Sequence, residues 1–191
     1  MNNNVTDLLN TDHIKLLFSI FEKNNADIRL VGGCIRDSLI SREVKDIDTA
    51  TKIEPQEVLN LLQNNNIEYD DFAIQYGSII SYPLNKKVQI TTLREDINQL
   101  GRHTNVIYTT DWKKDAARRD FTFNALYLGG NNKLYDYYDG LSHLKEKKIK
   151  FIGEIEDRIK EDYLRIYRYF RFLGLFEIPK VTLSDQKIVE K

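Results

Sequence analysis

The sequence contains little of what would indicate a secreted, membrane-bound or zinc-stabilised protein. Its one cysteine, Cys34, excludes an internal disulfide, and its three histidines lack the cysteine and histidine spacing of a zinc site. The first residues form neither an apolar leader nor an Arg-rich amphipathic segment, and no apolar run reaches the ~18 residues of a membrane span. We therefore expect a cytoplasmic protein with no membrane partner.

Net charge is also almost absent. The formal charge is -1 over 191 residues, with a sequence pI of about 6.3, so binding to nucleic acid would have to come from a local cationic patch. A hydrophobic fraction of 41% is enough for a packed core, and the length suits one domain with an appendage.

Hydrophobic periodicity divides the chain into short strands and helices. Apolar residues at helical spacing predict a helix over 11–24 that Thr11 could cap, and Pro55 marks the start of another. Short β-rich runs predict strands at 28–31, 45–49, 77–84 and 87–93, the last two forming a hairpin. The polar stretch 94–114 has no clear period and predicts a long functional loop.

Beyond residue 155 the pattern becomes helical and rich in charge and aromatic side chains. We place a boundary near Gly153, with a larger head at 1–152 and a helical neck segment at 153–191. Short strands mixed with helices, without regular βαβ alternation, predict an α+β fold with a mixed sheet.

A pair of acids, Asp46 and Asp48, is the first candidate for chemistry. On a strand, alternate side chains share a face, so these carboxylates would converge while Ile47 points to the core. Two close carboxylates need a compensating cation, and oxygen ligands suit Mg²⁺. An exposed strand edge or an Asx turn is the alternative interpretation.

Upstream of this pair, a strand, two glycines and a helix start at residues 30–37. Glycine allows a phosphate to approach the backbone, and a helix N-terminus offers free N–H groups. Gly33 and Arg36 are therefore candidate nucleotide-binding residues, with a plain strand-to-helix turn as the alternative.

Five motifs occur in order, and together they resemble one family. They are LVGGCIRD at 30–37, DIDTAT at 46–51, TTLRED at 91–96, RRDFTFNA at 118–125 and EDYLR at 161–165. This series resembles the class II tRNA nucleotidyltransferases (CCA-adding enzymes) and bacterial poly(A) polymerases. The resemblance implies a DNA-polymerase-β-like head with Mg²⁺ at Asp46 and Asp48, followed by a helical neck.

The RRD motif supplies guanidinium groups for phosphate or ribose and a carboxylate that can orient one of them. Arg119 and Asp120 are therefore candidate nucleotide-binding residues. The alternative is a surface ion-pair cluster, although the apolar residues that follow indicate a segment fixed to the core.

The last motif predicts base recognition. On a helix, Asp162 and Arg165 are neighbours at i and i+3, and Arg168 and Arg171 continue the basic stripe. Cytosine and adenine both present an amino donor beside a ring-nitrogen acceptor, which an Asp acceptor and an Arg donor match. Uracil and guanine present the reverse polarity, so this pair predicts CTP and ATP as substrates, with a solvated ion pair as the alternative.

Two softer features also resemble the family. The D-x-x-x-G spacing from Asp136 to Gly140 is similar to its hinge motif, with a type I turn as the alternative. The loop at 94–112 is similar to the flexible element of members that add the terminal A, which favours full CCA addition.

Two departures from the family leave alternatives open. A third acid on the neighbouring strand is missing, because Gln89 is among the inward-facing candidates there. The family continues into a helical body and tail that bind tRNA, and we expect these to be absent here. Three explanations of that absence stay open: a fragmentary chain, a minimal enzyme, and a head that works with a separate subunit or as a homo-oligomer. Poly(A) polymerase activity, partial CC or A addition and a non-catalytic binding module are the alternatives to CCA addition.

Overall fold

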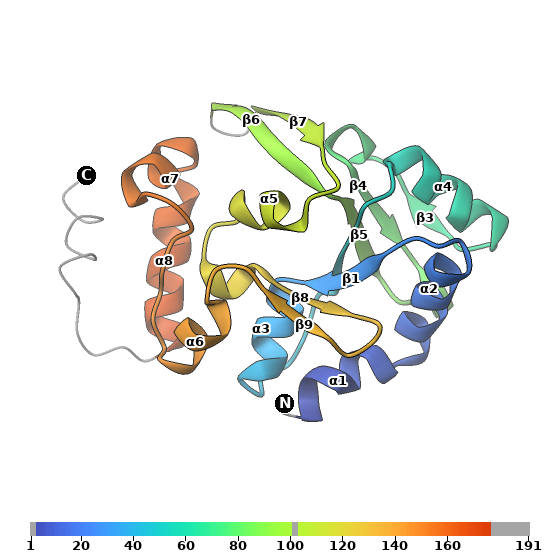
Figure 1. The fold of residues 1–191 in the computed structure, drawn as a ribbon, viewed down its shortest axis with the longest axis horizontal. Coiled ribbons are helices and arrows are strands. Elements are labelled where there is room, and N and C mark those ends of the chain that lie inside the picture. Colours follow the sequence, from blue (N-terminus) through green and yellow to red (C-terminus); the bar gives the residue numbers. More distant parts are fainter. Residues whose placement is uncertain (1–2, 101–102, 177–191) are drawn as a thin grey trace.

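A computed structural model of the protein describes residues 3–100 and 103–176 (Figure 1). The part of the predicted neck beyond residue 176 lies outside the described residues. The α-helices are α1 (Asn3–Asn10), α2 (Asp12–Lys23), α3 (Gly33–Leu39), α4 (Pro55–Asn64), α5 (Trp112–Ala117), α6 (Gly140–Lys145), α7 (Ile155–Glu161) and α8 (Leu164–Leu175). The strands are β1 (Ile28–Val31), β2 (Asp48–Thr51), β3 (Tyr69–Asp70), β4 (Ser78–Ser81), β5 (Val88–Thr92), β6 (Arg94–Leu100), β7 (His103–Tyr108), β8 (Leu126–Gly129) and β9 (Leu134–Asp136). Three single-turn 3₁₀ helices are η1 (Ile74–Tyr76), η2 (Pro83–Asn85) and η3 (Thr122–Asn124).

A seven-stranded mixed sheet forms the centre of the fold, in the order β3-β4-β5-β2-β1-β8-β9. The pair β2 and β5 is parallel, and the other neighbouring strands are antiparallel. The predicted α+β class with a mixed sheet is confirmed, as is the antiparallel pairing of the strands on either side of η2.

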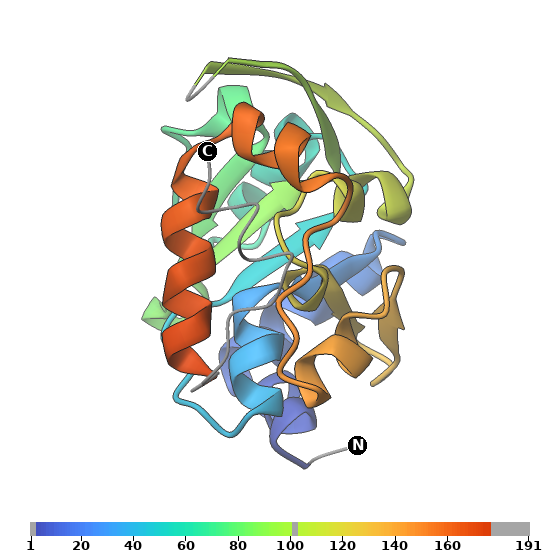
Figure 2. The same ribbon diagram turned by 90° about the vertical axis from the view of Figure 1, so that its left-hand side faces the viewer.

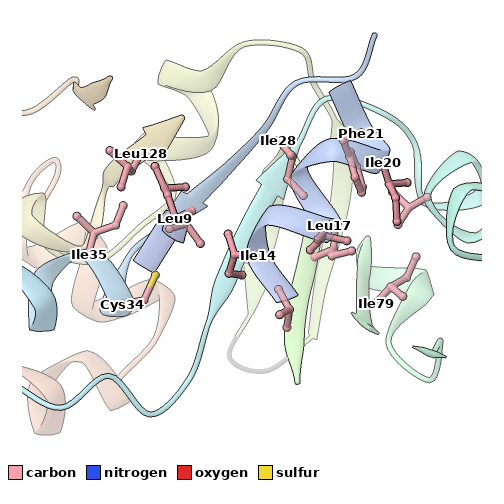
Figure 3. Close-up of a cluster of buried hydrophobic side chains, with 14 of the residues drawn as sticks. Leu9, Ile14, Leu17, Ile20, Phe21, Ile28, Cys34, Ile35, Ile79 and Leu128 are labelled. Atoms are coloured by element: carbon pink, nitrogen blue, oxygen red, sulfur yellow. The ribbon is translucent and has the colours of Figure 1, made fainter. Parts of the chain in front are cut away.

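Helices α1 to α4 cover one face of this sheet. Figure 3 shows Ile14, Leu17 and Phe21 of α2 packed with side chains of the neighbouring elements. Cys34 lies in the same cluster, and burial raises the pKa of its thiol to about 11, so it is an inert core residue. The predicted helix over 11–24 is confirmed, although the Thr11 hydroxyl donates to the Leu8 carbonyl (2.9 Å) instead of capping α2.

A smaller apolar cluster covers the opposite face. Val31 and Ala50 of the sheet pack there with Trp112 and Ala116 of α5 and with Tyr127 of β8. Because side chains alternate along a strand, Asp48 lies on the same face as Ala50, towards α5. The functional candidates therefore lie on the side of the sheet away from α1 to α4.

Two sequence predictions require correction. The strand predicted at 45–49 begins at Asp48, so Asp46 precedes it, although the Gln89 N–H still donates to the Ile47 carbonyl (2.9 Å). The long loop predicted at 94–114 is the antiparallel hairpin β6–β7 followed by α5. The hairpin has an irregular register between Ile97 and Leu100, and residues 101–102 at its tip lie outside the described residues.

Helices α7 and α8 lie beside the sheet, on the left in Figure 1, and the hairpin β6–β7 lies along the top of the molecule in both views (Figures 1 and 2). An aromatic cluster joins them to the preceding residues: Phe121 lies 5.3 Å from Phe172 and Phe151 lies 5.9 Å from Tyr169, measured between ring centroids. The domain boundary near Gly153 stays a prediction, because this core includes residues from both sides of it.

Among the helices that the structure describes, none has the length and apolar character needed to cross a membrane.

Candidate nucleotide-binding cleft

A polar cavity of about 970 Å³ lies between the sheet, the segment after α5 and helix α8. All the site residues predicted from the sequence line it: Gly33, Arg36, Asp46, Asp48, Arg119, Asp120, Asp162, Arg165, Arg168 and Arg171. Its walls carry nine cationic and seven anionic side chains, which forms the local charged patch that the net charge could not reveal. Motifs more than 100 residues apart in sequence thus meet in one place, while the roles of the individual residues stay predictions.

The acid pair lies at the start of β2. Asp48 is half-buried and Asp46 is exposed, and both line the cavity. Burial raises the pKa of Asp48, and the neighbouring Asp46 adds to this, while Arg119 and Lys87 act in the opposite direction. Two carboxylates whose shared charge is unfavourable without a cation fit a magnesium ion. Among the described residues no third acid, histidine or cysteine completes the pair, so the third ligand remains unassigned.

The glycine turn is required by backbone geometry. Gly32 has φ +77° and ψ -125°, a conformation that other residues rarely adopt. A Cβ atom on Gly33 would lie 3.6 Å from the Arg36 guanidinium, which itself pairs with both oxygens of Asp37 (2.9 and 2.8 Å). Arg36 also donates to Asn124 Oδ1 (2.5 Å), which fixes the start of α3 to the RRD segment.

Asp115 is a residue of this region that no sequence motif predicted. This fully buried carboxylate accepts hydrogen bonds from Arg118 Nε (2.9 Å), Arg119 Nη2 (3.0 Å) and the Tyr127 hydroxyl (2.7 Å). Burial alone would raise the pKa of Asp115, but the two arginines hold it well below its usual range. The i, i+3 and i, i+4 spacing to the arginines was the signal that could have identified it.

Asp120 has a different partner from the one expected. Its Oδ2 atom pairs with Arg168 Nη2 of α8 (2.8 Å), and its Oδ1 atom accepts from Asn124 Nδ2 (2.9 Å). The carboxylate that orients Arg118 and Arg119 is therefore Asp115, while Asp120 connects the RRD segment to α8.

The predicted base reader also differs in local structure. Asp162 lies in the turn between α7 and α8, where its Oδ1 atom accepts from the Leu164 N–H (2.9 Å), so the pair does not share one helix. Arg165 donates to Glu161 Oε2 (2.5 Å) and to the Arg158 carbonyl (2.7 Å). The prediction that Asp162 and Arg165 are i, i+3 neighbours on one helix is wrong. Both side chains nevertheless line the cavity.

Arg158 was also missed by sequence analysis. Its Nη2 atom donates to the carbonyls of Arg118 (2.6 Å) and Arg119 (3.0 Å), and its Nη1 atom pairs with Glu161 (2.6 Å). This side chain fixes α7 directly to the backbone of the RRD motif.

The D-x-x-x-G segment, Asp136 to Gly140, forms the turn that leads into α6. The Asp136 carboxylate accepts from the N–H groups of Tyr138 (3.2 Å), Gly140 (2.9 Å) and Leu141 (2.8 Å) at the start of α6. A Cβ atom on Gly140 would lie 2.3 Å from the Thr122 carbonyl oxygen, so glycine is required by close packing against η3. Whether the segment acts as a hinge stays a prediction.

This arrangement defines a nucleotidyltransferase head of the DNA-polymerase-β type: a mixed sheet with two acids at one strand, a glycine turn beside them and a helix that closes the cleft. The family model described as "Poly A polymerase head domain" matches residues 28–150. The chain belongs to this family.

Curated relatives agree with this assignment. The chain is 42% identical over 165 residues to "CCA tRNA nucleotidyltransferase 1, mitochondrial" of Danio rerio, covering 86% of this chain and 38% of that protein. It is 35% identical over 170 residues to the "CCA-adding enzyme" of Lactobacillus delbrueckii subsp. bulgaricus, covering 88% of this chain and 42% of that protein. The chain therefore spans less than half the length of these relatives.

Solved structures show the same fold. The Bacillus stearothermophilus CCA-adding enzyme in complex with CTP superposes with a TM-score of 0.75 at 26% identity, covering 91% of this chain and 40% of that chain. The apo form II of a CCA-adding enzyme gives a TM-score of 0.79 at 21% identity, over all of this chain and 44% of that one, which supports the fold alone.

Proposed function

We propose that the protein transfers CMP and AMP from CTP and ATP to the 3′ end of tRNA without a nucleic-acid template. One observation carries this proposal: the acid pair Asp46 and Asp48 and the predicted base reader Asp162 and Arg165 line the same cavity. The names of the curated relatives give it further support.

Asp46 and Asp48 would hold Mg²⁺, which when bound supplies positive charge to the phosphates and orients the reacting oxygens. Gly33 leaves room for the triphosphate beside Arg36, and Arg119 offers a guanidinium group that Asp115 already orients. Because these donors are fixed before the substrate binds, little reorganisation is needed during the reaction.

We assign base selection to the residues at the start of α8. Asp162 would accept from the exocyclic amino group of cytosine or adenine, and Arg165 would donate to the ring nitrogen. Arg168, which pairs with Asp120, and Arg171 would hold the base-recognising pair Asp162 and Arg165 in position or bind phosphate. Uracil and guanine present the reverse pattern and would be rejected.

The decisive experiment incubates the chain with tRNA transcripts that end before the first C, after CC, or complete, with each nucleoside triphosphate in turn. Asp46→Ala should lower CMP incorporation by roughly 10³-fold, because it removes half of the acid pair that binds the metal. Asp70→Ala, which changes an exposed aspartate on β3, is the matched control and should leave incorporation unchanged. Full turnover by Asp46→Ala with an intact circular dichroism spectrum would contradict the assignment.

The family description favours one alternative, a poly(A) polymerase that uses ATP alone. The same nucleotide panel with oligo(A) primers separates the two functions, since CMP incorporation is expected from the CCA-adding activity alone. Addition of CC or A only, or activity that appears only after a second subunit is supplied, would identify a partial enzyme or a head subunit. Cytoplasmic location belongs to the same proposal.

A further inference from the structure

A second cavity, of about 780 Å³, lies where α3, α6 and the end of α8 meet. These elements lie together in the lower half of the molecule in both views (Figures 1 and 2). We call this space the apolar groove. Its walls include partly exposed aliphatic side chains from α3, β9, α6 and α8 and from the turn after α3, namely Leu39, Ile40, Leu134, Leu141 and Leu175.

The apolar groove lies at the junction of two hydrophobic cores. Leu39 packs against both the core beneath α1 to α4 and the aromatic core of α8. Leu134 and Leu141 pack against the first core, and Leu175 packs against the second. Because neither core covers these side chains fully, aliphatic surface remains in contact with solvent where the two cores meet. A contiguous apolar surface of this kind is typical of an interaction site.

The charged side chains at the groove are all cationic. Arg42, Lys145 and Lys147 line it and are exposed, and among the described residues that line it none is acidic. Glu146, between the two lysines, is not among the lining residues and accepts a hydrogen bond from Ser142 Oγ (2.8 Å). The nucleotide cleft carries charges of both signs, so the apolar groove has the more uniform positive charge.

The backbone presents two of these cations from turns in a conformation that favours glycine. Lys147 follows α6 with φ +54°, and Ser41, directly before Arg42, has φ +57°. The Lys148 N–H donates to the His143 carbonyl (2.8 Å), which closes the turn around Lys147. A lysine at a position where glycine would avoid strain is consistent with a use for its charge.

Aliphatic walls bordered by cations match an acidic amphipathic segment, which can bury one apolar face and direct carboxylates to the rim. RNA could pair with the cations, but the partly exposed walls are aliphatic and Phe176 is buried, so the groove offers no ring for base stacking. Residues 177–191, which continue the chain from this point, contain as many lysines as acids and bring no net negative charge.

We propose that the apolar groove binds an acidic amphipathic segment of a partner protein. The aliphatic side chains of that segment lie against the leucines, and its carboxylates pair with Arg42, Lys145 and Lys147. Arg42 and Leu175 also line the nucleotide cleft, so the bound segment lies directly beside that cleft. The inference does not depend on which reaction the cleft catalyses.

The test titrates a fluorescein-labelled helical peptide into the complete chain and follows the fluorescence anisotropy. The peptide carries leucine at positions i, i+3, i+4 and i+7 and glutamate on its other face, and it should bind with a Kd in the micromolar range. One control peptide has lysine in place of glutamate, and another has serine in place of leucine. Each control should bind roughly tenfold more weakly or not at all, because it lacks the charge or the apolar face.

A matched pair of variants locates the charge effect. Lys147→Glu should raise the Kd of the acidic peptide roughly tenfold, because it replaces attraction by repulsion at the rim of the groove. Lys148→Glu makes the same change at the next residue, which is exposed and is not among the residues that line the groove. It should change the Kd less than about twofold. An equal effect of both variants would show that the peptide responds only to overall charge, and would overturn the inference.

Amide NMR signals of the isotope-labelled complete chain locate the bound peptide. Signals of residues 39–42, 141–147 and 175–176 should shift on titration, and the same residues should be unaffected by the serine peptide. Shifts confined to residues of the nucleotide cleft outside these ranges would overturn the inference. Three other results would assign the groove to a different occupant and also overturn it: displacement of residues 177–191 by the peptide, an oligomer that Lys147→Glu dissociates in sedimentation, or an RNA hairpin that shifts the groove signals at a lower concentration than the peptide.

Discussion

Asp115 controls both arginines of the cleft from a position with no solvent exposure. It binds Arg118 and Arg119 through separate oxygens and also accepts the Tyr127 hydroxyl. A buried carboxylate with two cationic partners stabilises the fold only while it is ionised. The positions of both arginines therefore depend on this one charge.

Asp115→Asn should lower the free energy of unfolding at pH 7 by about 3 kcal/mol, because it removes the nearest counter-charge of two partly buried guanidinium groups. Arg118 keeps one more distant acidic partner, Asp96, at 3.8 Å. The pKa of Asp115 is depressed in the folded state. Its contribution is therefore complete above the ordinary aspartate pKa of 3.8 and is lost as the pH falls further towards the folded value. Urea unfolding at a series of pH values should show the difference between variant and wild type shrinking below that point.

Asp111→Asn provides the matched control on the same helix. Asp111 caps α5 by accepting from the Lys113 N–H (2.8 Å), and asparagine is an equally good cap. Its stability should match that of the wild type at every pH. An equally large loss in both variants would show that the interior ion pairs have no special role.

Most of the predicted residues of the cleft could be found from sequence because they belong to short motifs, in which the chemistry depends on neighbouring residues of the chain. The Gly-Gly turn and the acid pair are examples, and the structure brings both into one cavity. The connections between motifs were not predictable. The pairing of Asp120 with Arg168 depends on how α8 packs, which no local pattern records.

At the scale of elements, the hairpin β6–β7 shows that hydrophobic periodicity does not identify a strand that packs no face against an apolar core. Its strands pair with each other in a separate two-stranded sheet, so burial imposes no alternation of apolar residues. Ion pairs fix its base to α5 and to the C-cap of that helix instead, between Glu95 and Lys114 and between Asp96 and Arg118. Strands β1 and β5, which have a buried face, were recognised from sequence, whereas the fully buried strand β8 was not.

Helix α6 depends on glycine at its first residue. Gly140→Ala would place a methyl group against the Thr122 carbonyl and the Phe123 backbone, which cannot move without displacing η3. We expect a loss of about 1–3 kcal/mol in the free energy of unfolding, as is typical of overpacking. Urea denaturation at neutral pH measures it.

Gly174→Ala is the natural comparison, because nothing lies within 4 Å of the added Cβ and the residue is inside α8. This change should stabilise the protein by up to about 1 kcal/mol through helix propensity. If both alanine variants behaved alike, steric contact at Gly140 would not explain its presence.

At the scale of the whole molecule, the fold has cores on both faces of the sheet and a third at the junction with α7 and α8. The junction core includes Phe121 and Phe123, which directly follow the RRD motif, together with Phe172 of α8. Packing of α7 and α8 and the shape of the cleft are therefore coupled.

A fragment of residues 1–152 should be less stable than one of residues 1–176. Each phenylalanine that becomes exposed lowers the free energy of unfolding by about 1.5–3 kcal/mol, and several become exposed together. The fragment should unfold at a lower urea concentration and bind a hydrophobic dye. Equal stability of the two fragments would instead establish residues 1–152 as an independent domain.

Trp112 is the single tryptophan of the chain, and its surroundings make it an optical probe. Its ring is stacked on the Arg29 guanidinium (3.8 Å from ring centroid to Cζ) and meets the Tyr127 ring edge-on at 5.3 Å. Tyr127 in turn binds Asp115, so one fluorophore is connected to the arginine cluster of the cleft through two contacts. Its emission therefore reports both the integrity of the fold and the state of the cleft without any added label.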